Sequence, residues 1–184
     1  MENIPQLLPH EAHLLESALN SLKEEQNELG KLMGEAMTQA SETYHDNAPA
    51  EVIASESAIL YARARPLLDL LKNYVVIEYP AGEPIEKVIL GSKVVAEIND
   101  RMDEVFIVGN SGLYDRQLFK SIQHLTRINS DSLESAIFVS INAPLAKTLL
   151  GKRGGENARL IVGDKITNIR IHSIERGFLP VEKT

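Results

Sequence analysis

Residues 15–40, LESALNSLKEEQNELGKLMGEAMTQA, carry apolar residues at alternating steps of four and three. The series is Leu15, Leu19, Leu22, Gln26, Leu29, Met33, Ala36 and Ala40, and only Gln26 is polar. This spacing forms one stripe along an α-helix and is typical of a coiled-coil seam. Pro9 suits the first turn of a helix, where its missing N–H costs no hydrogen bond. We therefore expect a helix from about Pro9 to about residue 41.

A second apolar series repeats the same steps. It consists of Ile53, Ser57, Leu60, Ala64, Leu67, Leu71 and Tyr74. Residues 41–50, between the two series, are polar and rich in turn and capping residues. Each helix can bury the narrow apolar seam of the other if the chain folds back on itself. The two series therefore predict an antiparallel helical hairpin over residues 1–78. Pro66 removes the hydrogen bond to the Ala62 carbonyl, but the series continues beyond it, so we expect a kink rather than an end.

From residue 79 onward the pattern changes to an alternation of apolar and polar residues. The segments expected as strands are Lys93–Ile98, Glu104–Val108, Ser135–Ile141, Arg159–Val162 and Lys165–Ile171. Pro144 and Gly151 suit the start of a short helix and the position just after it. Residues 111–134 are ambiguous. We expect a second domain over 79–184, an antiparallel sheet with one short helix, and hence an α+β fold.

Composition excludes several classes of site. The 184 residues include no cysteine, so disulfides, thiolate metal sites and a cysteine nucleophile are absent. The apolar runs are far shorter than the ~20 residues that span a bilayer. The first residues, Met-Glu-Asn-Ile-Pro, lack the basic start and the apolar stretch of a signal peptide. We expect a soluble cytoplasmic protein.

The net charge of −7 is concentrated in the first part of the chain. Residues 1–76 hold 12 acidic and 5 basic residues, whereas residues 77–184 hold 14 of each. A protein that binds free DNA or RNA needs lysine and arginine to neutralise phosphates, so free nucleic acid is a poor partner. The acidic part is expected to favour cations or a basic protein surface.

Three segments resemble those of the bacterial transcription elongation factors GreA and GreB. Asp46-Asn47-Ala48 is similar to the Glu-Asn-Ala of that family's hairpin tip. Val88-Ile-Leu-Gly-Ser-Lys-Val94 resembles the opening strand of its second domain. The most specific match is SINAPLAKTLLGK at 140–152, which is similar to S-x-x-S-P-L-G-x-A-L-L-G-K. The order of parts, an acidic-tipped hairpin before a small β domain, is also that of the family.

The resemblance implies an FKBP-like second domain that docks on RNA polymerase. We assign this contact to Asn142, Pro144 and Leu145. The resemblance also implies that the hairpin enters the secondary channel of the polymerase. We expect a monomer that contacts nascent RNA only indirectly and does not interact with free DNA or membranes.

In the family, two acids at the tip hold a magnesium ion at the polymerase active site. Mg²⁺ prefers hard oxygen ligands, and a metal-bound water assists phosphodiester cleavage. Asp46 matches the family's Glu, while Thr43 stands opposite the family's Asp in an ungapped alignment. Glu42 replaces that Asp if the turn has one extra residue. The expected catalytic and metal-binding residues are thus Glu42 and Asp46, which would assist the polymerase, with no cofactor of the chain's own and Mg²⁺ shared only in the complex.

Two alternatives remain open at this point. Pro49-Ala50 replaces the Glu-Tyr that follows Asn-Ala in the family, and the first helix carries only Lys23 and Lys31 where the family places a basic patch. A non-cleaving regulator or inhibitor of the polymerase therefore stands beside a cleavage factor. An FKBP-like peptidyl-prolyl isomerase or chaperone is the third candidate. It would draw on Phe106, Tyr114, Phe119, Phe138 and Phe178 for an aromatic pocket.

The five histidines show no metal-ligand spacing beyond the pair His10 and His13. We expect surface positions for His10, His13, His124 and His172.

Overall fold

The computed structural model describes residues 4–40, 48–78, 84–114 and 136–178. The chain forms two compact units. The first unit combines Met1–Leu14 with Val75–Thr184, and the second is Leu15–Tyr74. The domains expected from the sequence, 1–78 and 79–184, differ from these units at two places, because residues 1–14 and 75–78 belong with the sheet. The fold class is the expected α+β arrangement, with the helices preceding a sheet that is mostly antiparallel.

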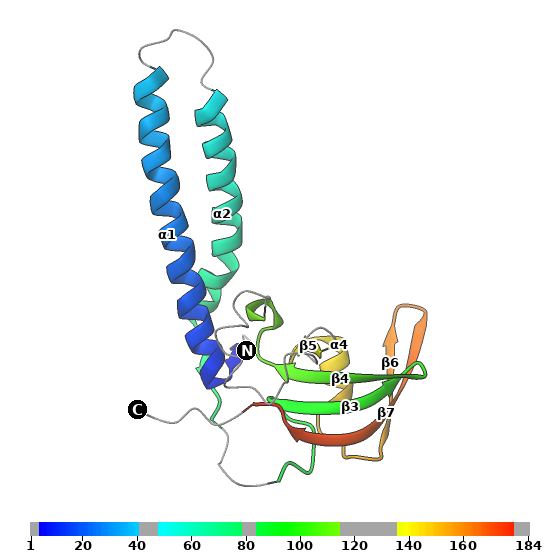
Figure 1. The fold of residues 1–184 in the computed structure, drawn as a ribbon. Helices are drawn as coiled ribbons and strands as arrows, with labels where there is room; N and C mark the ends of the chain where they lie inside the picture. Colours follow the sequence, from blue (N-terminus) through cyan, green and yellow to red (C-terminus); the bar gives the residue numbers. More distant parts are fainter. Residues whose placement is uncertain (1–3, 41–47, 79–83, 115–135, 179–184) are drawn as a thin grey trace. The chain divides into compact units, whose positions relative to one another are not determined.

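The second unit is a helical hairpin. Helix α1 (Pro9–Ala40) and helix α2 (Ala48–Lys72) run side by side in opposite directions (Figure 1). Leu22, Ala36 and Leu60, all members of the predicted seam, are buried. The hairpin predicted from the heptad pattern is therefore confirmed.

The seam differs from the prediction at two positions. Leu71 is 43% exposed, and its neighbour Leu70 is buried instead. Gln26 faces solvent, as its polar side chain favours. Pro66 lies inside α2 and does not end the helix, which continues to Lys72 as expected.

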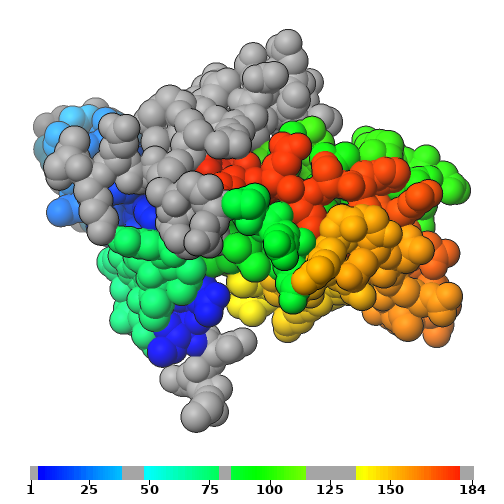
Figure 2. Space-filling model, turned by 90° about the horizontal axis from the view of Figure 1, so that it is seen from below, coloured from blue at the N-terminus to red at the C-terminus, as the bar shows by residue number. Residues whose placement is uncertain are grey.

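A five-stranded sheet forms the centre of the first unit, with the strand order β5-β4-β3-β7-β6. Its strands are β3 (Ser92–Ile98), β4 (Arg101–Val108), β5 (Ala136–Ser140), β6 (Asn157–Val162) and β7 (Lys165–Arg176). Four of these strands cover their predicted segments, and β5 matches residues 136–140 of the predicted Ser135–Ile141, of which Ser135 lies outside the described residues. Figure 2 shows the surfaces of β6, in orange, and β7, in orange to red, next to each other.

One pairing in the sheet differs from the expected antiparallel arrangement. Strand β5 pairs with β4 in parallel, with Val105 opposite Ile137 and Ile107 opposite Val139. A parallel pair needs a crossover of a dozen or more residues, and residues 109–135 provide that length. The other strand pairs of this sheet are antiparallel, and a β-bulge between Val95 and Ala96 shifts the register of β3 against β7.

Two short turns join the antiparallel strands. Asn99 (φ 50°) and Asp100 (φ 64°) connect β3 to β4, with Ile98 paired to Arg101. Positive φ at both central residues matches the right-handed twist of the strands, and Asn and Asp tolerate it better than most residues. Gly163, with φ 58°, makes the corresponding turn between β6 and β7.

The core of the sheet unit lies between one face of the sheet and a short helix. Helix α4 (Pro144–Leu149) buries Ala146 and Leu149 against it. The strands contribute Val94, Ala96, Val105, Ile107, Val139, Ile169 and Ile171. These positions alternate along each strand, because successive side chains of a strand point to opposite faces.

A pair of short strands and a 3-10 turn also belong to this unit. Strand β1 (Gln6–Leu7) pairs in parallel with β2 (Val75–Val76), a pairing that the sequence did not predict. A 3-10 turn, η1 (Ser111–Leu113), follows β4 and is capped by the Asn110 side chain, which accepts from Gly112 N.

Replacing Gly34 by alanine should stabilise the hairpin. Gly34 lies inside α1, and a Cβ built there meets no atom within 4 Å. Alanine lowers the entropy that the chain loses on forming the helix, so we expect the free energy of unfolding to rise by about 1 kcal/mol. Urea denaturation followed by circular dichroism measures the change.

Gly163→Ala is the matched control. A Cβ at Gly163 also meets no atom within 4 Å, but its φ of 58° is unfavourable for alanine. This substitution should destabilise the protein by about 1 kcal/mol. A loss of stability in Gly34→Ala would contradict the description of α1 as an open, continuous helix at this position.

Candidate functional site

The two acids expected at the hairpin tip, Glu42 and Asp46, lie outside the described residues, as does Thr43. The helix bounds nevertheless define their place in the chain. Helix α1 ends at Ala40 and α2 begins at Ala48, so all three belong to the link between the two helices. Glu51 lies in the first turn of α2, where the helix dipole favours a negative charge.

The three residues expected to contact the polymerase lie close together in the chain, with Asn142 in the connection after β5 and Pro144 and Leu145 at the start of α4. Asn142 and Pro144 are exposed, and Leu145 is partly buried against the core of the sheet unit. Leu145 therefore has a packing role in addition to any contact with a partner. Asn142 and Pro144 are the two side chains of this group that are presented to solvent.

Backbone hydrogen bonds fix the shape of this loop. Ile141 N donates to Val108 O at 2.7 Å, and Ala143 N donates to Ser140 O at 2.8 Å. The Ser140 hydroxyl accepts from Ser111 N at 2.8 Å and joins the loop to η1. Pro144 is the first residue of α4, a position where no helical N–H partner is lost. The loop is thus a rigid strand-to-helix connection that holds Asn142 and Pro144 outward.

Glu11 is a buried carboxylate that sequence analysis missed. Its side chain is 0% exposed and accepts hydrogen bonds from three backbone N–H groups. Leu8 N lies 2.6 Å from Oε2, while Gly109 N and Asn110 N lie 2.9 and 3.0 Å from Oε1. Burial raises the pKa of Glu11 to about 7, and the backbone donors act in the opposite direction.

Gly109 is required for this contact. A Cβ at residue 109 would overlap the backbone carbonyl of Gln6 and lie 2.6 Å from Oε2 of Glu11. The backbone after β4 therefore approaches the start of α1 closely enough for its N–H to reach the carboxylate. No local sequence pattern marks this pair, which is separated by 98 residues.

His10 is buried, and the expectation of a surface position for it was wrong. Its exposed fraction is 2%, and Nε2 lies 2.6 Å from the Tyr114 hydroxyl. Its ring packs on Phe178, with the centroids 4.3 Å apart. Burial lowers the pKa of His10 to about 4, with a smaller contribution from His13. His13 and His172 are exposed as expected, and His124 lies outside the described residues.

The aromatic residues considered for an isomerase pocket pack on one another. Tyr114 stacks on Phe138 with centroids 4.5 Å apart, and Phe106 stacks on Phe138 at 5.3 Å. Phe178 meets Phe106 at 6.0 Å. These four rings pack with His10 in one cluster, in which Phe106 and Phe178 are buried. The fifth, Phe119, lies outside the described residues.

A hollow of about 900 Å³ lies elsewhere on the sheet unit. Its charged lining is mixed and comprises Glu97, Asp100, Lys152, Arg159 and Arg170. It contains none of the predicted site residues. Within the described part of the chain, no group of three or more histidine, aspartate and glutamate residues is arranged to hold a metal ion. No helix in that part is long and apolar enough to cross a membrane.

Glu11 and His10 should give the free energy of unfolding opposite pH dependences. The folded state raises the pKa of Glu11 from 4.5 to about 7. The stabilising contribution of Glu11 to the free energy of unfolding is therefore fully present below pH 4.5 and is lost as the pH rises through about 7. The folded state lowers the pKa of His10 from 6.5 to about 4, so the contribution of His10 is full above pH 6.5 and lost as the pH falls through about 4.

Glu11→Gln separates these two effects. We expect the free energy of unfolding of this variant, relative to wild type, to rise by up to roughly 3 kcal/mol between about pH 5 and pH 8. The reason is that ionisation of the buried residue 11 destabilises only the wild type in this range. Urea unfolding at each pH measures the difference, and the carboxyl NMR shift of Glu11 reports its ionisation directly. A difference that stays constant with pH would contradict the assignment.

Comparison with known proteins gives matches among solved structures. No protein-family model matches the chain, and no curated protein matches its sequence. GreA factor homolog 1 (Gfh1) of Thermus thermophilus is 24% identical, with 94% of this chain and 99% of that one covered and a TM-score of 0.40. Gfh1 of Thermus aquaticus is 22% identical, with coverages of 92% and 97% and a TM-score of 0.34.

A third similar structure is the prokaryotic transcription elongation factor GreA/GreB from Nitrosomonas europaea. It is 18% identical, with 66% of this chain and 93% of that one covered and a TM-score of 0.32.

Proposed function

We propose that the chain is a Gre-type transcription factor that binds RNA polymerase and inserts its helical hairpin into the secondary channel. The observation that carries the proposal is the hairpin itself. Two long antiparallel helices are joined by a link that contains Glu42 and Asp46, and the same chain holds the segment 140–152 in a rigid loop and helix. A slender hairpin with acids at its end suits entry into a narrow pore that contains a metal ion.

The sheet unit provides the docking surface in this proposal. Asn142 and Pro144 are exposed on a connection whose backbone is fixed by hydrogen bonds to β4 and β5. A rigid surface loses little conformational entropy on binding, which favours affinity. Leu145 packs against the core and so anchors the loop to the sheet unit.

The link between the helices provides the metal-binding carboxylates in this proposal. Carboxylate oxygens are ligands that Mg²⁺ prefers, so Glu42 and Asp46 are suited to a magnesium ion shared with the polymerase. Such an ion activates water toward a phosphodiester. The chain itself contributes binding and carboxylates, and the polymerase catalyses the cleavage. The same docking without productive placement of the acids yields a non-cleaving regulator, which is the alternative form of the proposal.

The isomerase alternative loses support from the packing of the aromatic residues. Phe106, Tyr114, Phe138 and Phe178 contact one another, and Phe106 is fully buried. Phe178 is also buried, so neither Phe106 nor Phe178 presents its ring to solvent.

Pro144→Asp should weaken binding to purified bacterial RNA polymerase by at least about tenfold. The substitution places a charge on the proposed contact surface, while an acid in the first turn of α4 leaves the helix intact. Competition between labelled wild type and unlabelled variant on core polymerase measures the affinity. Lys165→Ala, an exposed change on β7, is the control and should bind as the wild type. Wild-type affinity in Pro144→Asp would place the docking surface elsewhere.

The tip acids are tested with backtracked transcription complexes. We expect the wild type to accelerate shortening of the RNA, and Asp46→Ala and Glu42→Ala to lose at least about tenfold of that acceleration while still binding polymerase, because each removes a metal-binding carboxylate. Glu51→Ala, in the first turn of α2, is the acidic control and should remain active.

Thr43→Ala tests the alignment of the link. It should remain active if Glu42 replaces the family's Asp, and it should lose activity if residue 43 holds that position. A wild-type protein that binds polymerase without shortening RNA would rule out the cleavage form and leave the non-cleaving regulator.

A further inference from the structure

The helical hairpin has a groove along one flank. It is about 310 Å³ in volume and is formed by two matching sets of residues. Helix α1 contributes Glu25, Glu28, Leu29 and Leu32, and α2 contributes Glu56, Ile59, Leu60 and Arg63. Each set has the spacing i, i+3, i+4, i+7, which places its members on one face of its helix.

The groove has an apolar floor that two helices leave partly uncovered. Leu60 is buried at the seam, but Leu32 is 49% exposed and Ile59 is 60% exposed. Val52, seven residues before Ile59 on the same face of α2, is 58% exposed and extends the apolar surface toward the link. Large apolar side chains exposed in one row suit contact with a partner.

The rim of the groove is acidic. Glu25, Glu28 and Glu56 line it, and Glu35 continues the row from Glu28 at a spacing of seven. Arg63 is the one cation of the lining, and its Nη1 lies 3.2 Å from Oε2 of Glu25. Within the described residues, Glu28, Glu35 and Glu56 form no salt bridge. The rim thus retains an excess of negative charge.

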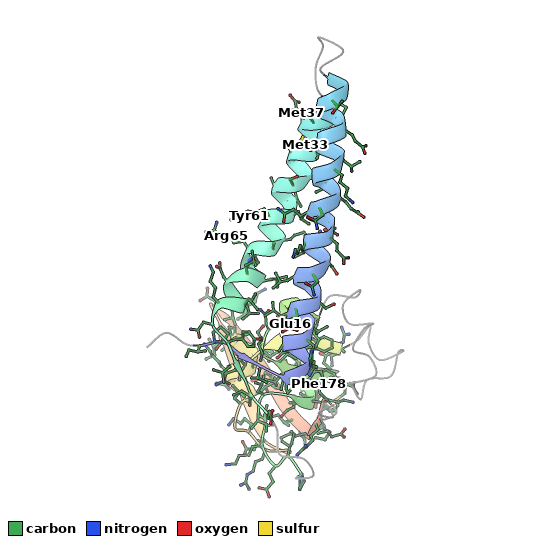
Figure 3. The ribbon with its side chains drawn as sticks, turned by 90° about the vertical axis from the view of Figure 1, so that its left-hand side faces the viewer. Glu16, Met33, Met37, Tyr61, Arg65 and Phe178 are labelled. Atoms are coloured by element: carbon green, nitrogen blue, oxygen red, sulfur yellow. The ribbon has the colours of Figure 1, made fainter. Side chains whose placement is uncertain are left out.

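The opposite flank of the hairpin differs in charge. Tyr61 is two residues beyond Ile59 and hence about 200° around α2. Figure 3 shows Tyr61 and Arg65 projecting from α2 away from α1. Arg65 is thus a cation on that side of α2, whereas Glu25, Glu28 and Glu56 line the groove.

We propose that this groove binds a third helix, a segment of a partner protein whose apolar stripe is flanked by lysine and arginine. The stripe would cover Leu32, Ile59 and Val52, and the cations would meet Glu28, Glu35 and Glu56. A second copy of the chain fits poorly, because its own groove presents the same carboxylates and like charges repel. Nucleic acid is disfavoured for the same reason.

This inference goes beyond the proposed function and does not depend on it. The test uses the full chain and a fluorescein-labelled helical peptide of about 18 residues, with leucines at i, i+3/i+4 and i+7 and lysine or arginine beside them. A second peptide keeps the leucines and replaces the cations by glutamate. Fluorescence anisotropy measures both affinities. We expect the basic peptide to bind at least about tenfold more tightly, with an affinity that falls as salt is added.

Ile59→Ser and Tyr61→Ser form a matched pair of variants. Both side chains are exposed, at 60% and 65%, so neither substitution should unfold the helix. Ile59→Ser should weaken binding of the basic peptide at least about tenfold, and Tyr61→Ser should leave it unchanged. Glu28→Gln combined with Glu56→Gln should reduce the preference for the basic peptide over the acidic one.

Three results would overturn the proposal. The first is equal affinity for the basic and acidic peptides or no binding of either, and the second is an equal loss in Tyr61→Ser. The third is a concentration-dependent dimer in sedimentation velocity that Ile59→Ser abolishes, which would assign the groove to a second copy. No polymerase is present in these measurements, so their failure is distinguishable from failure of the proposed function.

Discussion

The sheet unit depends on the buried carboxylate of Glu11. This side chain accepts from Leu8 N, just before α1, and from Gly109 N and Asn110 N, just after β4. A buried carboxylate without such donors would cost several kcal/mol, so these bonds are a condition for this packing. The close approach in turn requires glycine at 109, because a Cβ would overlap the Gln6 carbonyl. The start of α1 therefore belongs to the sheet unit, together with His10 and the aromatic residues around it.

Periodic elements were predictable from the sequence, and isolated long-range contacts were not. The heptad spacing predicts α1 and α2, and alternation predicts β3, β4, β5, β6 and β7, because each pattern repeats within its own segment. The parallel pairs β1–β2 and β4–β5 join segments distant in the sequence, and β1 and β2 are two residues long. Glu11 reads as an ordinary acid in the first turn of a helix, since its partners Gly109 and Asn110 lie about a hundred residues away.

The candidate sites show the same division. The motif at 140–152 identified Asn142 and Pro144, and the structure holds both outward, yet the supporting contact between Ser140 and Ser111 has no sequence signal. The seam series contains Leu29 and Leu60, which form the base of the groove. The seam series cannot show which residues of the facing helix lie beside Leu29 and Leu60, because those neighbours depend on the register of one helix against the other. Leu32 and Ile59 consequently read as isolated surface residues until both helices are in place.

Two kinds of acidic residue on one hairpin imply two kinds of partner chemistry. Glu42 and Asp46 belong to a polar link, where a carboxylate can exchange water for a cation at little cost. Glu28 and Glu56 stand beside exposed leucine and isoleucine side chains, so a bare ion would neutralise them but leave the apolar floor in water. Only a partner with both apolar and basic side chains satisfies both features, because burying the floor without cations would also desolvate the carboxylates. In the two proposals made for this hairpin, the acids of the link would meet a metal ion and the acids of one flank would meet a protein partner, so substitutions in one set leave the other set intact.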